Sequence, residues 1–430
     1  MRSSCQANKW NFKCPVMAHN RTLRVAKLVK IGQKTKFILI LLDNYSQQMY
    51  RFRPAWSKFI LPTIWVLLFA VCILAPNYPN LVAIYYNQGF FKYWTIGLRW
   101  LFGSIPFALG ELVYVIAIIL LIINLIRYIT SLKRLNQIWQ KIGFILFKLA
   151  WLGIRLFVVF QFIWGFNYMQ PDPTNAFNLK VQTPKNVQIA QTELNQLTNE
   201  LIQELNQTRK ELSKNNEIAP NFEQTLAKVQ DAYGRISKTY PKFHVQNQSV
   251  KKAIFPNLGD YIGFLAYYQP ITAEAIIRSD LPMMTQPYTI AHEMAHQLGY
   301  ASETEANFIA FVVATEANDP MLRYSMLLQM FTYAQDAQLL LIAGTKGFDA
   351  WKAQIAENKA LLSPAVLNDR AEIKAFFVAR AGKQFQASNE LYDQFLKWNQ
   401  QAAGLDSYAD VLKWVRAYRL KTDSSTSYSR

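Results

Sequence analysis

Apolar positions are concentrated in three long runs within the first 165 residues of the chain. The runs cover roughly residues 59–75, 106–125 and 145–164 and contain few charged side chains. A helix of about 20 apolar residues crosses the roughly 30 Å hydrocarbon layer of a bilayer. The first run lies too far from the N-terminus to be an ordinary signal peptide. The pattern therefore predicts three transmembrane helices within residues 59–165.

The pattern changes after the third run. Pro171 and Pro173 indicate a linker over residues 166–185. Apolar residues then recur at helical spacing over residues 186–213 and 222–238, each time with a polar opposite face. These segments are typical of amphipathic helices in a water-exposed domain.

Residues 250–278 have a different texture, rich in aromatic and β-branched residues, Gly and Pro, which predicts short strands and turns. Helical patterns return from Pro287 onward. The predicted fold class is thus an α-helical membrane region followed by a mostly helical α+β domain with a small sheet. This domain is assigned to residues 186–420, and residues 421–430 are expected to be a disordered tail.

Charge adds information about the membrane. The net charge is +18, and basic residues recur throughout residues 1–58, where Asp43 is the only acidic residue. No nucleic-acid-binding motif accompanies them, so we expect a membrane flank and no nucleic-acid partner. The tail is long, and Met49 is an alternative start of the protein.

The loops between the apolar runs predict the orientation of the chain. The first loop carries only two basic residues, and the second carries more: Lys92 and Arg99, against Arg127, Lys133, Arg134 and Lys141. Lys and Arg favour the cytoplasmic side. We therefore expect a multi-pass protein of the inner (cytoplasmic) membrane, in contact with membrane lipid. Its N-terminus is expected in the cytoplasm and everything after the third helix outside.

Two charged residues interrupt the apolar runs. Glu111 lies in the second run and Arg155 near the middle of the third. A central Arg costs about 2.5–3.5 kcal/mol on insertion scales. An ion path is one interpretation. We favour a structural one, in which Arg155 pairs with Glu111 or reaches the interface, because one pair is too few for a relay.

The motif HEMAH lies within QPYTIAHEMAHQLG, residues 286–299. Pro287 suits the first turn of a helix, and Gly299 suits its end. His292 and His296 would share one face of that helix and could bind one zinc ion (Zn2+). Between them Glu293 could take a proton from water that the metal acidifies. A chance match is the alternative, but two of only four histidines stand here, and the rest of the helix is small and apolar.

A catalytic zinc ion usually takes a third protein ligand. No histidine follows His296, and the three cysteines lie at or before residue 72. Glu303 and Glu305 are the close alternatives, while Glu316 is farther along the next helix. Ser302 and Glu305 fit a capping box, which would occupy Glu305 and leave Glu303 free. We therefore predict Glu303 as the metal ligand, with Asn307 one turn later positioning a histidine.

HExxH followed by Glu303 and Asn307 resembles the gluzincin class of metallopeptidases. In that class the residue four after the glutamate hydrogen-bonds a metal-bound histidine. The chain is also similar to an uncharacterised family of bacterial three-pass membrane proteins with an extracytoplasmic zincin-like domain. The resemblance covers about residues 59–420, through PFALGELVYVIAIILLI, WGFNYMQP, AYYQPITAEAII, HEMAHQLGYASETEANFIAF, SNELYDQFLKWN and SYADVLKW. One departure is Ala273, where that family is expected to have glycine.

In zincins, a strand before the motif helix lines the cleft and pairs with an extended substrate. Residues 274–278, EAIIR, are the predicted equivalent. Several tyrosines could stabilise an oxyanion, although core packing is the simpler expectation for each: Tyr267, Tyr268, Tyr300, Tyr392 and Tyr408. The remaining histidines, His19 and His244, are not expected to be ligands.

The sequence thus predicts a membrane-anchored zinc metallopeptidase that hydrolyses peptide bonds outside the cytoplasm, with Glu293 as general base. The motif lies in a polar segment well after the third helix, so we expect cleavage in water and not inside the bilayer. Its partner would be a peptide or protein substrate. The alternative is a non-catalytic membrane scaffold or sensor that retains a zinc site.

Overall fold

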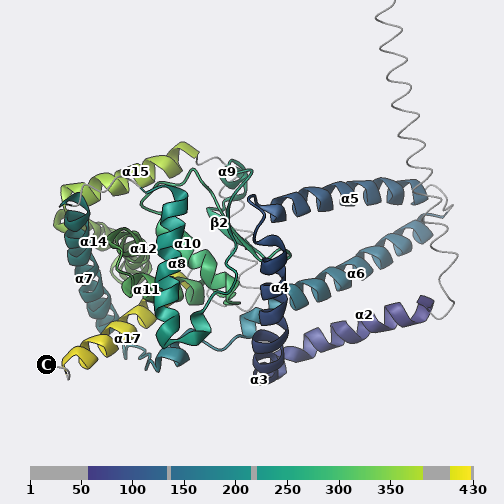
Figure 1. The fold of residues 1–430 in the computed structure, drawn as a ribbon, viewed down its shortest axis with the longest axis horizontal. Coiled ribbons are helices and arrows are strands. Elements are labelled where there is room, and N and C mark those ends of the chain that lie inside the picture. Colours follow the sequence, from purple (N-terminus) through teal and green to yellow (C-terminus); the bar gives the residue numbers. More distant parts are fainter. Residues whose placement is uncertain (1–56, 133–136, 215–219, 381–406, 428–430) are drawn as a thin grey trace, which may run out of the picture. The chain divides into compact units, whose positions relative to one another are not determined.

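A computed structural model describes residues 57–132, 137–214, 220–380 and 407–427 (Figure 1). The chain divides into two compact units, Met1–Leu68 and Phe69–Arg430. Of the first unit, the described residues are the start of one apolar helix. Most of the basic tail assigned to residues 1–58 lies outside the described residues.

Three helices are long and apolar enough to cross a membrane: α2 (Ser57–Leu74), α5 (Leu109–Leu132) and α6 (Ile138–Ile163). Most of their apolar side chains are exposed, which suggests a membrane protein. The three predicted runs are confirmed as helices. The third helix starts earlier than predicted, because the polar residues around Lys141 continue it.

The segment between α2 and α5 is mostly helical, although we treated it as a loop. It contains η1 (Ala75–Asn77), α3 (Pro79–Leu81), a π-helical stretch η2 (Val82–Phe91) and α4 (Lys92–Phe102). Its buried residues recur about one helical turn apart, at Ala83, Tyr86, Asn87, Phe91, Thr95 and Arg99. This stripe packs on the domain that follows α6, and that long-range contact is what the local pattern did not reveal.

The predicted linker after α6 is instead folded. Two short 3-10 helices, η3 (Gly165–Met169) and η4 (Pro173–Phe177), follow α6 directly. Pro173 opens η4 under the cap of Asp172, whose carboxylate accepts from the Thr174 backbone N–H at 2.7 Å. Phe177 is buried in the main core, so this segment is part of the domain.

The domain after α6 is mostly helical, as predicted. Its helices are α7 (Val187–Lys214), α8 (Phe222–Thr239), η5 (Pro241–Phe243), α9 (Leu258–Ile262), α10 (Gln286–Gln297), α11 (Glu303–Thr315), α12 (Pro320–Gln338), η6 (Leu339–Ala343), α13 (Gly344–Lys346), α14 (Phe348–Leu361), α15 (Pro364–Arg380) and α17 (Ser407–Ser427). Every residue of α11 from Thr304 to Ala314 is buried, which makes it the central helix of the core. Helix α17 extends into the tail that is expected to be disordered, and Lys421, the first residue of that tail, donates from Nζ to the carbonyl of Phe177 at 2.6 Å.

A small mixed sheet precedes the motif helix. It contains β1 (Val250–Lys252), β2 (Ala266–Gln269) and β3 (Glu274–Ile277), in the order β1-β3-β2. Strand β3 pairs in parallel with β1 and antiparallel with β2. The predicted strand therefore exists, but it is central. Both of its edges are occupied, so the prediction that it pairs with a substrate is wrong.

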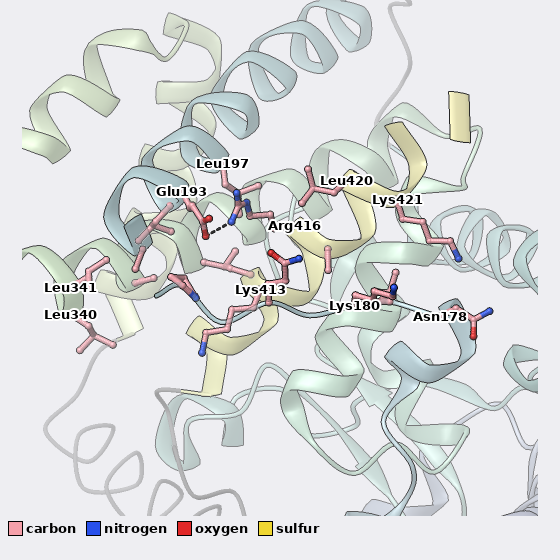
Figure 2. A pocket seen from close by; sticks show the side chains of 18 residues that line it. Asn178, Lys180, Glu193, Leu197, Leu340, Leu341, Lys413, Arg416, Leu420 and Lys421 are labelled. Carbon is pink, nitrogen blue, oxygen red and sulfur yellow. Dashed lines mark ion pairs between the residues drawn. The ribbon is translucent and has the colours of Figure 1, made fainter. Parts of the chain in front are cut away.

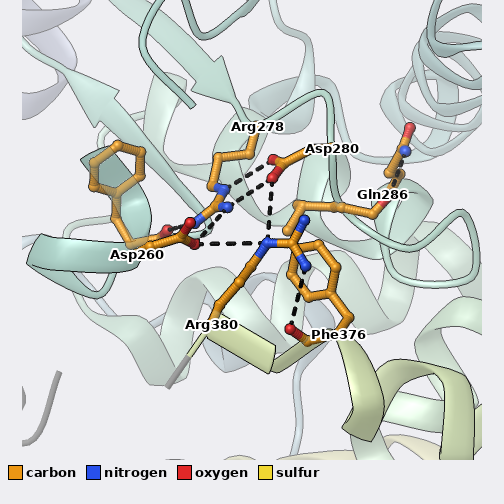
Figure 3. Close-up of polar contacts among 8 residues, drawn as sticks. Asp260, Arg278, Asp280, Gln286, Phe376 and Arg380 are labelled. Carbon is orange, nitrogen blue, oxygen red and sulfur yellow. Dashed lines mark hydrogen bonds and ion pairs between the residues drawn. The ribbon is translucent and has the colours of Figure 1, made fainter. Parts of the chain in front are cut away.

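The two ends of β3 are held in different ways. Ala273, just before the strand, has φ of 55°, a left-handed conformation that favours glycine, which accounts for the expectation of glycine there. After the strand, the buried Arg278 guanidinium bonds Asp260 at 2.8 Å and Asp280 at 2.7 Å (Figure 3). Arg380, at the end of α15, lies beside the same two carboxylates and thereby ties α15 to the sheet.

Of the two structural alternatives for Arg155, the pairing with Glu111 is wrong. Glu111 is buried, and its Oε2 accepts from the backbone N–H groups of Ile254 at 2.6 Å and Phe255 at 3.1 Å. Arg155 is exposed, with its guanidinium carbon 5.2 Å from the ring centroid of Trp151. Glu111 therefore joins the first turn of α5 to the domain, and nothing in its contacts resembles an ion relay.

Candidate metal centre

The motif forms one helix, as the sequence predicts. Helix α10 has Pro287 in its first turn, where the missing N–H costs nothing, and it ends just before Gly299, whose φ is 89°. A side chain at Gly299 would lie 2.9 Å from the Phe91 ring and 3.1 Å from the Asn167 side chain. Only glycine suits both this backbone conformation and this close packing.

The turn at Gly299 leads directly into α11. Ser302 is the N-cap of α11, and Glu303 is its first residue. The short connection folds α11 back against α10. As a result, the first turn of α11 lies beside the histidine-bearing face of the motif helix.

Three side chains converge at this point. The Nε2 atoms of His292 and His296 are 3.1 Å apart. Glu303 Oε2 is 3.2 Å from His292 Nε2, and Glu303 Oε1 is 3.9 Å from His296 Nε2. Among the described residues, these form the one group of three or more His, Cys, Asp or Glu side chains with ligand atoms close enough to share a metal ion.

The spacing of these atoms fits zinc. Ligands held tetrahedrally about 2.0–2.1 Å from a zinc ion lie about 3.3–3.4 Å from one another. The 3.1 Å and 3.2 Å separations are close to that value, and the 3.9 Å separation, which involves the other Glu303 oxygen, is longer. Two imidazoles and one carboxylate also match a common catalytic donor set, which leaves a fourth position open.

The histidines differ in what holds them. His296 Nδ1 lies 2.5 Å from the carbonyl oxygen of Tyr300, so this nitrogen donates and Nε2 is left with its lone pair facing His292. Burial, together with the neighbouring His292, lowers the pKa of His296 to about 4. Burial is the largest influence on His292 and lowers its pKa, but the bond and charge of Glu303, the charge of Glu293 and the bond to Asn307 together outweigh it, and the net pKa of His292 is raised.

Asn307 lies one turn after Glu303 and beside His292, where its side chain contributes to the raised pKa of that ring. Its Oδ1 accepts from the hydroxyl of Tyr288 at 2.9 Å. The sequence predicted that this oxygen would accept from a histidine N–H. That role stays a prediction: the Asn307 side chain acts on His292 as a hydrogen-bond partner that raises its pKa, and its Oδ1 also joins α11 to α10 through Tyr288.

Glu293 is buried, and one carboxylate oxygen, Oε2, has no hydrogen-bond partner. Burial raises the pKa of Glu293 to about 8, the nearby His292 opposes this rise, and Glu303 adds to it. A buried carboxylate without a partner is costly, and such groups concentrate at functional sites. Glu293 has the placement expected of a proton acceptor next to the cluster.

The two alternative glutamates occupy different places. Glu305 accepts from the backbone N–H of Ser302, as the capping-box argument requires, but the Ser302 side chain does not complete the box. Burial raises the pKa of Glu305 well above its usual range, and Asp172 adds to that rise. Glu316 is the C-cap of α11 and accepts from the Tyr418 hydroxyl at 2.8 Å. Neither is part of the cluster of three.

The tyrosines proposed from the sequence have structural contacts. Tyr267 donates to Glu111 at 3.4 Å, Tyr268 packs on Trp164 with centroids 4.9 Å apart, and the Tyr300 ring is part of the main core. Tyr392 lies outside the described residues, and the side chain of Tyr408 is not described. His244 is exposed and separate from the cluster, and His19 is outside the described residues.

The structure adds residues that the sequence did not suggest. Tyr168 of η3 and Tyr333 of α12 lie close enough to Glu303 for its charge to raise their pKa values, although burial is the larger cause. The Trp164 ring lies 5.9 Å from the His296 ring. All three come from segments distant in sequence, so no local pattern could have indicated them.

Arg99 of α4 is another such residue. It is buried, and its guanidinium donates to the carbonyl of Gln297 at 3.1 Å and to that of Gln246 at 3.0 Å. Gln297 is the last residue of α10, so a cation lies at the C-terminal end of the motif helix, where the helix dipole favours it. We had counted Arg99 only as a loop charge.

A separate groove lies between the start of α7, η6, α17 and the segment before α7 (Figure 2). Its volume is about 700 Å³, its lining is largely apolar, and an ion pair between Glu193 and Arg416 crosses it. No residue of the cluster lines this groove. The groove is therefore separate from the candidate metal centre.

No curated protein and no solved structure matches the chain significantly. One family model does match, over residues 86–416, which include most of η2, helices α4, α5 and α6, and the cluster. This range is more than half of the chain. The chain therefore belongs to the family described as "Protein of unknown function (DUF3810)".

Proposed function

We propose that the protein is a membrane-anchored zinc metallopeptidase. The observation that carries the proposal is the convergence of His292, His296 and Glu303 at distances suited to one tetrahedral ion. HExxH followed by a glutamate on the next helix, with Asn307 four residues after that glutamate, also resembles the gluzincin class. We accordingly infer a zincin-like domain after α6.

A zinc ion held by these three side chains would supply Lewis-acid polarisation of a peptide carbonyl and would acidify water. Glu293 would take the proton of the attacking water and deliver it to the leaving amine. The Tyr300 carbonyl keeps the Nε2 lone pair of His296 directed at the cluster. The buried Oε2 atom of Glu293, which has no hydrogen-bond partner, favours this catalytic proposal over a scaffold or sensor, because a purely structural zinc site needs no proton acceptor.

We further propose that α10 and α11 lie on the outer side of the inner membrane. The proposal rests on the basic residues before α2 and between α5 and α6. Reporter fusions after residue 140 should report the cytoplasm, and fusions after residue 175 the exterior. A cytoplasmic signal after residue 175 would reverse this orientation.

The proposed function is tested on the purified full-length protein in detergent or nanodiscs. Wild type should contain close to one zinc ion per chain, and His292→Ala should lose it. Glu293→Gln should keep zinc and abolish hydrolysis of a peptide library. The full chain is needed because Arg99 and Glu111 make bonds that a fragment starting at residue 170 would lack.

Retained zinc with no Glu293-dependent hydrolysis would favour the scaffold or sensor. Absence of zinc in folded wild type after loading would overturn the metal centre itself. A Glu305→Gln variant is the matched control, because it alters a nearby buried glutamate outside the cluster.

A further inference from the structure

The candidate metal centre lies very close to the end of one apolar span. The ring of His296 is 5.9 Å from the ring of Trp164, and Trp164 is the C-cap of α6. Helix α6 has 26 residues and is therefore about 39 Å long. It exceeds the roughly 30 Å hydrocarbon layer by about 9 Å. Even if all this excess lay at its C-terminal end, Trp164 would be only about 9 Å outside the hydrocarbon.

The start of α5 holds the domain at the same membrane surface. Glu274 of β3 accepts from the backbone N–H of Gly110 at 2.7 Å and from that of Leu109 at 3.3 Å, and so caps α5. Glu111 of α5 in turn accepts from backbone N–H groups of the domain, as described above. Lys251 of β1 pairs with Glu274 at 3.2 Å, and both side chains are buried. Because β3 packs against α10, the cluster is fixed relative to both spans.

The segment from α3 to α4 has two contrasting faces. One face packs on the turn after the motif helix, where Phe91 meets Gly299 and Arg99 binds Gln297. The other face exposes large aromatic and apolar side chains: Leu81, Ile84, Tyr85, Phe90, Tyr93, Trp94, Trp100 and Leu101. Tyr and Trp are enriched where a membrane protein meets the interface between lipid and water. Because the segment connects two apolar spans, we infer that its exposed face contacts the bilayer interface.

We propose, on the basis of the peptidase function proposed above, that the substrate is a polypeptide anchored in the same bilayer. It would be cut in the segment just outside its own membrane anchor. An extended chain covers about 3.3 Å per residue. A site roughly 10–20 Å from the hydrocarbon is therefore reached by residues about 3–6 positions beyond the end of a substrate span.

Cleavage would still take place in water, as the sequence predicts, but close to the membrane surface. Anchoring of enzyme and substrate in one bilayer raises their effective concentration without any further contact. The reaction is simple hydrolysis. Water adds its OH to the acyl carbon and its proton to the amine as the C–N bond breaks, which gives a carboxylic acid and an amine (a carboxylate and an ammonium at neutral pH) and needs no further reactant.

The first test measures depth in the membrane and is independent of catalysis. A nitroxide label is placed at Trp100→Cys or, as a control, at Leu361→Cys, in a background whose native cysteines have been replaced. Both native side chains are exposed, but Leu361 ends α14 in the helical domain. In nanodiscs, relaxation by oxygen should exceed relaxation by a nickel chelate at Trp100→Cys, with the reverse at Leu361→Cys. A water-exposed signature at both positions would overturn the proposal.

The second test identifies cleavage sites. Membranes from cells that express wild type or Glu293→Gln are compared by labelling of new N-termini. Termini that depend on Glu293 should map within about ten residues of the outer end of a membrane anchor. Termini confined to freely soluble proteins would overturn the membrane-substrate proposal and leave the peptidase intact. No Glu293-dependent termini at all would overturn the peptidase function, and the substrate proposal with it.

Discussion

Replacement of Glu303 by Gln removes the charge of the proposed third metal ligand while keeping its size. Both carboxylate oxygens face the histidines, at 3.2 Å and 3.9 Å from the nearest Nε2 atoms. Four-ligand zinc sites bind with about 10–16 kcal/mol, or about 2.5–4 kcal/mol for each ligand if shared equally. Loss of one ligand should therefore weaken zinc binding by about 10²- to 10³-fold.

The matched control is Glu305→Gln. Glu305 is two residues away and buried, and its pKa is raised well above the usual range, so an amide is a close mimic of its protonated form. Zinc affinity in this variant should change by less than about threefold. Glu305→Ala would in addition cost a helix cap of about 0.5–2 kcal/mol in stability, without emptying the site.

Zinc affinity is measured by competition with a chelator on the full-length variants, and thermal unfolding confirms that each is folded. A zinc-free Glu305→Gln variant together with a loaded Glu303→Gln variant would exchange the ligand assignment. Unchanged affinity in both would refute the inference of a three-residue site.

Three further predictions concern the supports of this site. Arg99→Met leaves the end of α10 without its charged donor and should cost about 3 kcal/mol, because two charge-assisted bonds are lost; unfolding in detergent measures it. Lys251→Met should cost about 3–5 kcal/mol by leaving the charge of buried Glu274 without its ion-pair partner, and the double variant with Glu274→Gln should recover part of that loss in the same assay. Gly299→Ala places a side chain in a left-handed conformation against Phe91 and should lower the free energy of unfolding by at least about 1–2 kcal/mol. Zinc titration of the same variant should show weaker binding, because the turn sets the position of Glu303. Stability equal to wild type in any of these variants would contradict the corresponding contact.

The local sequence was sufficient to predict the three apolar helices and the motif helix. Helical spacing alone places His292 and His296 on one face, because the period of a helix is a local property. Gly299 and the short connection to Ser302 also made Glu303 a reasonable neighbour. The same local argument predicted a capping box at the start of α11, and one of its two bonds is present. Glu305 accepts from the Ser302 backbone N–H, but the Ser302 side chain makes no capping hydrogen bond.

Tertiary structure decided the features that join distant segments. Arg99 binds Gln297 across 198 positions of sequence, and Trp164 meets His296 across more than a hundred. Strand β3 is central only because β1 pairs with it from the other side, which no period-two pattern specifies. The sequence indicates that Glu111 is a charge within a membrane span. In the structure its carboxylate binds the backbone N–H of Ile254, which belongs to a distant segment. The sequence of each segment sets its helical or extended form, whereas burial and pairing with remote groups set which of its polar residues carry structure or chemistry.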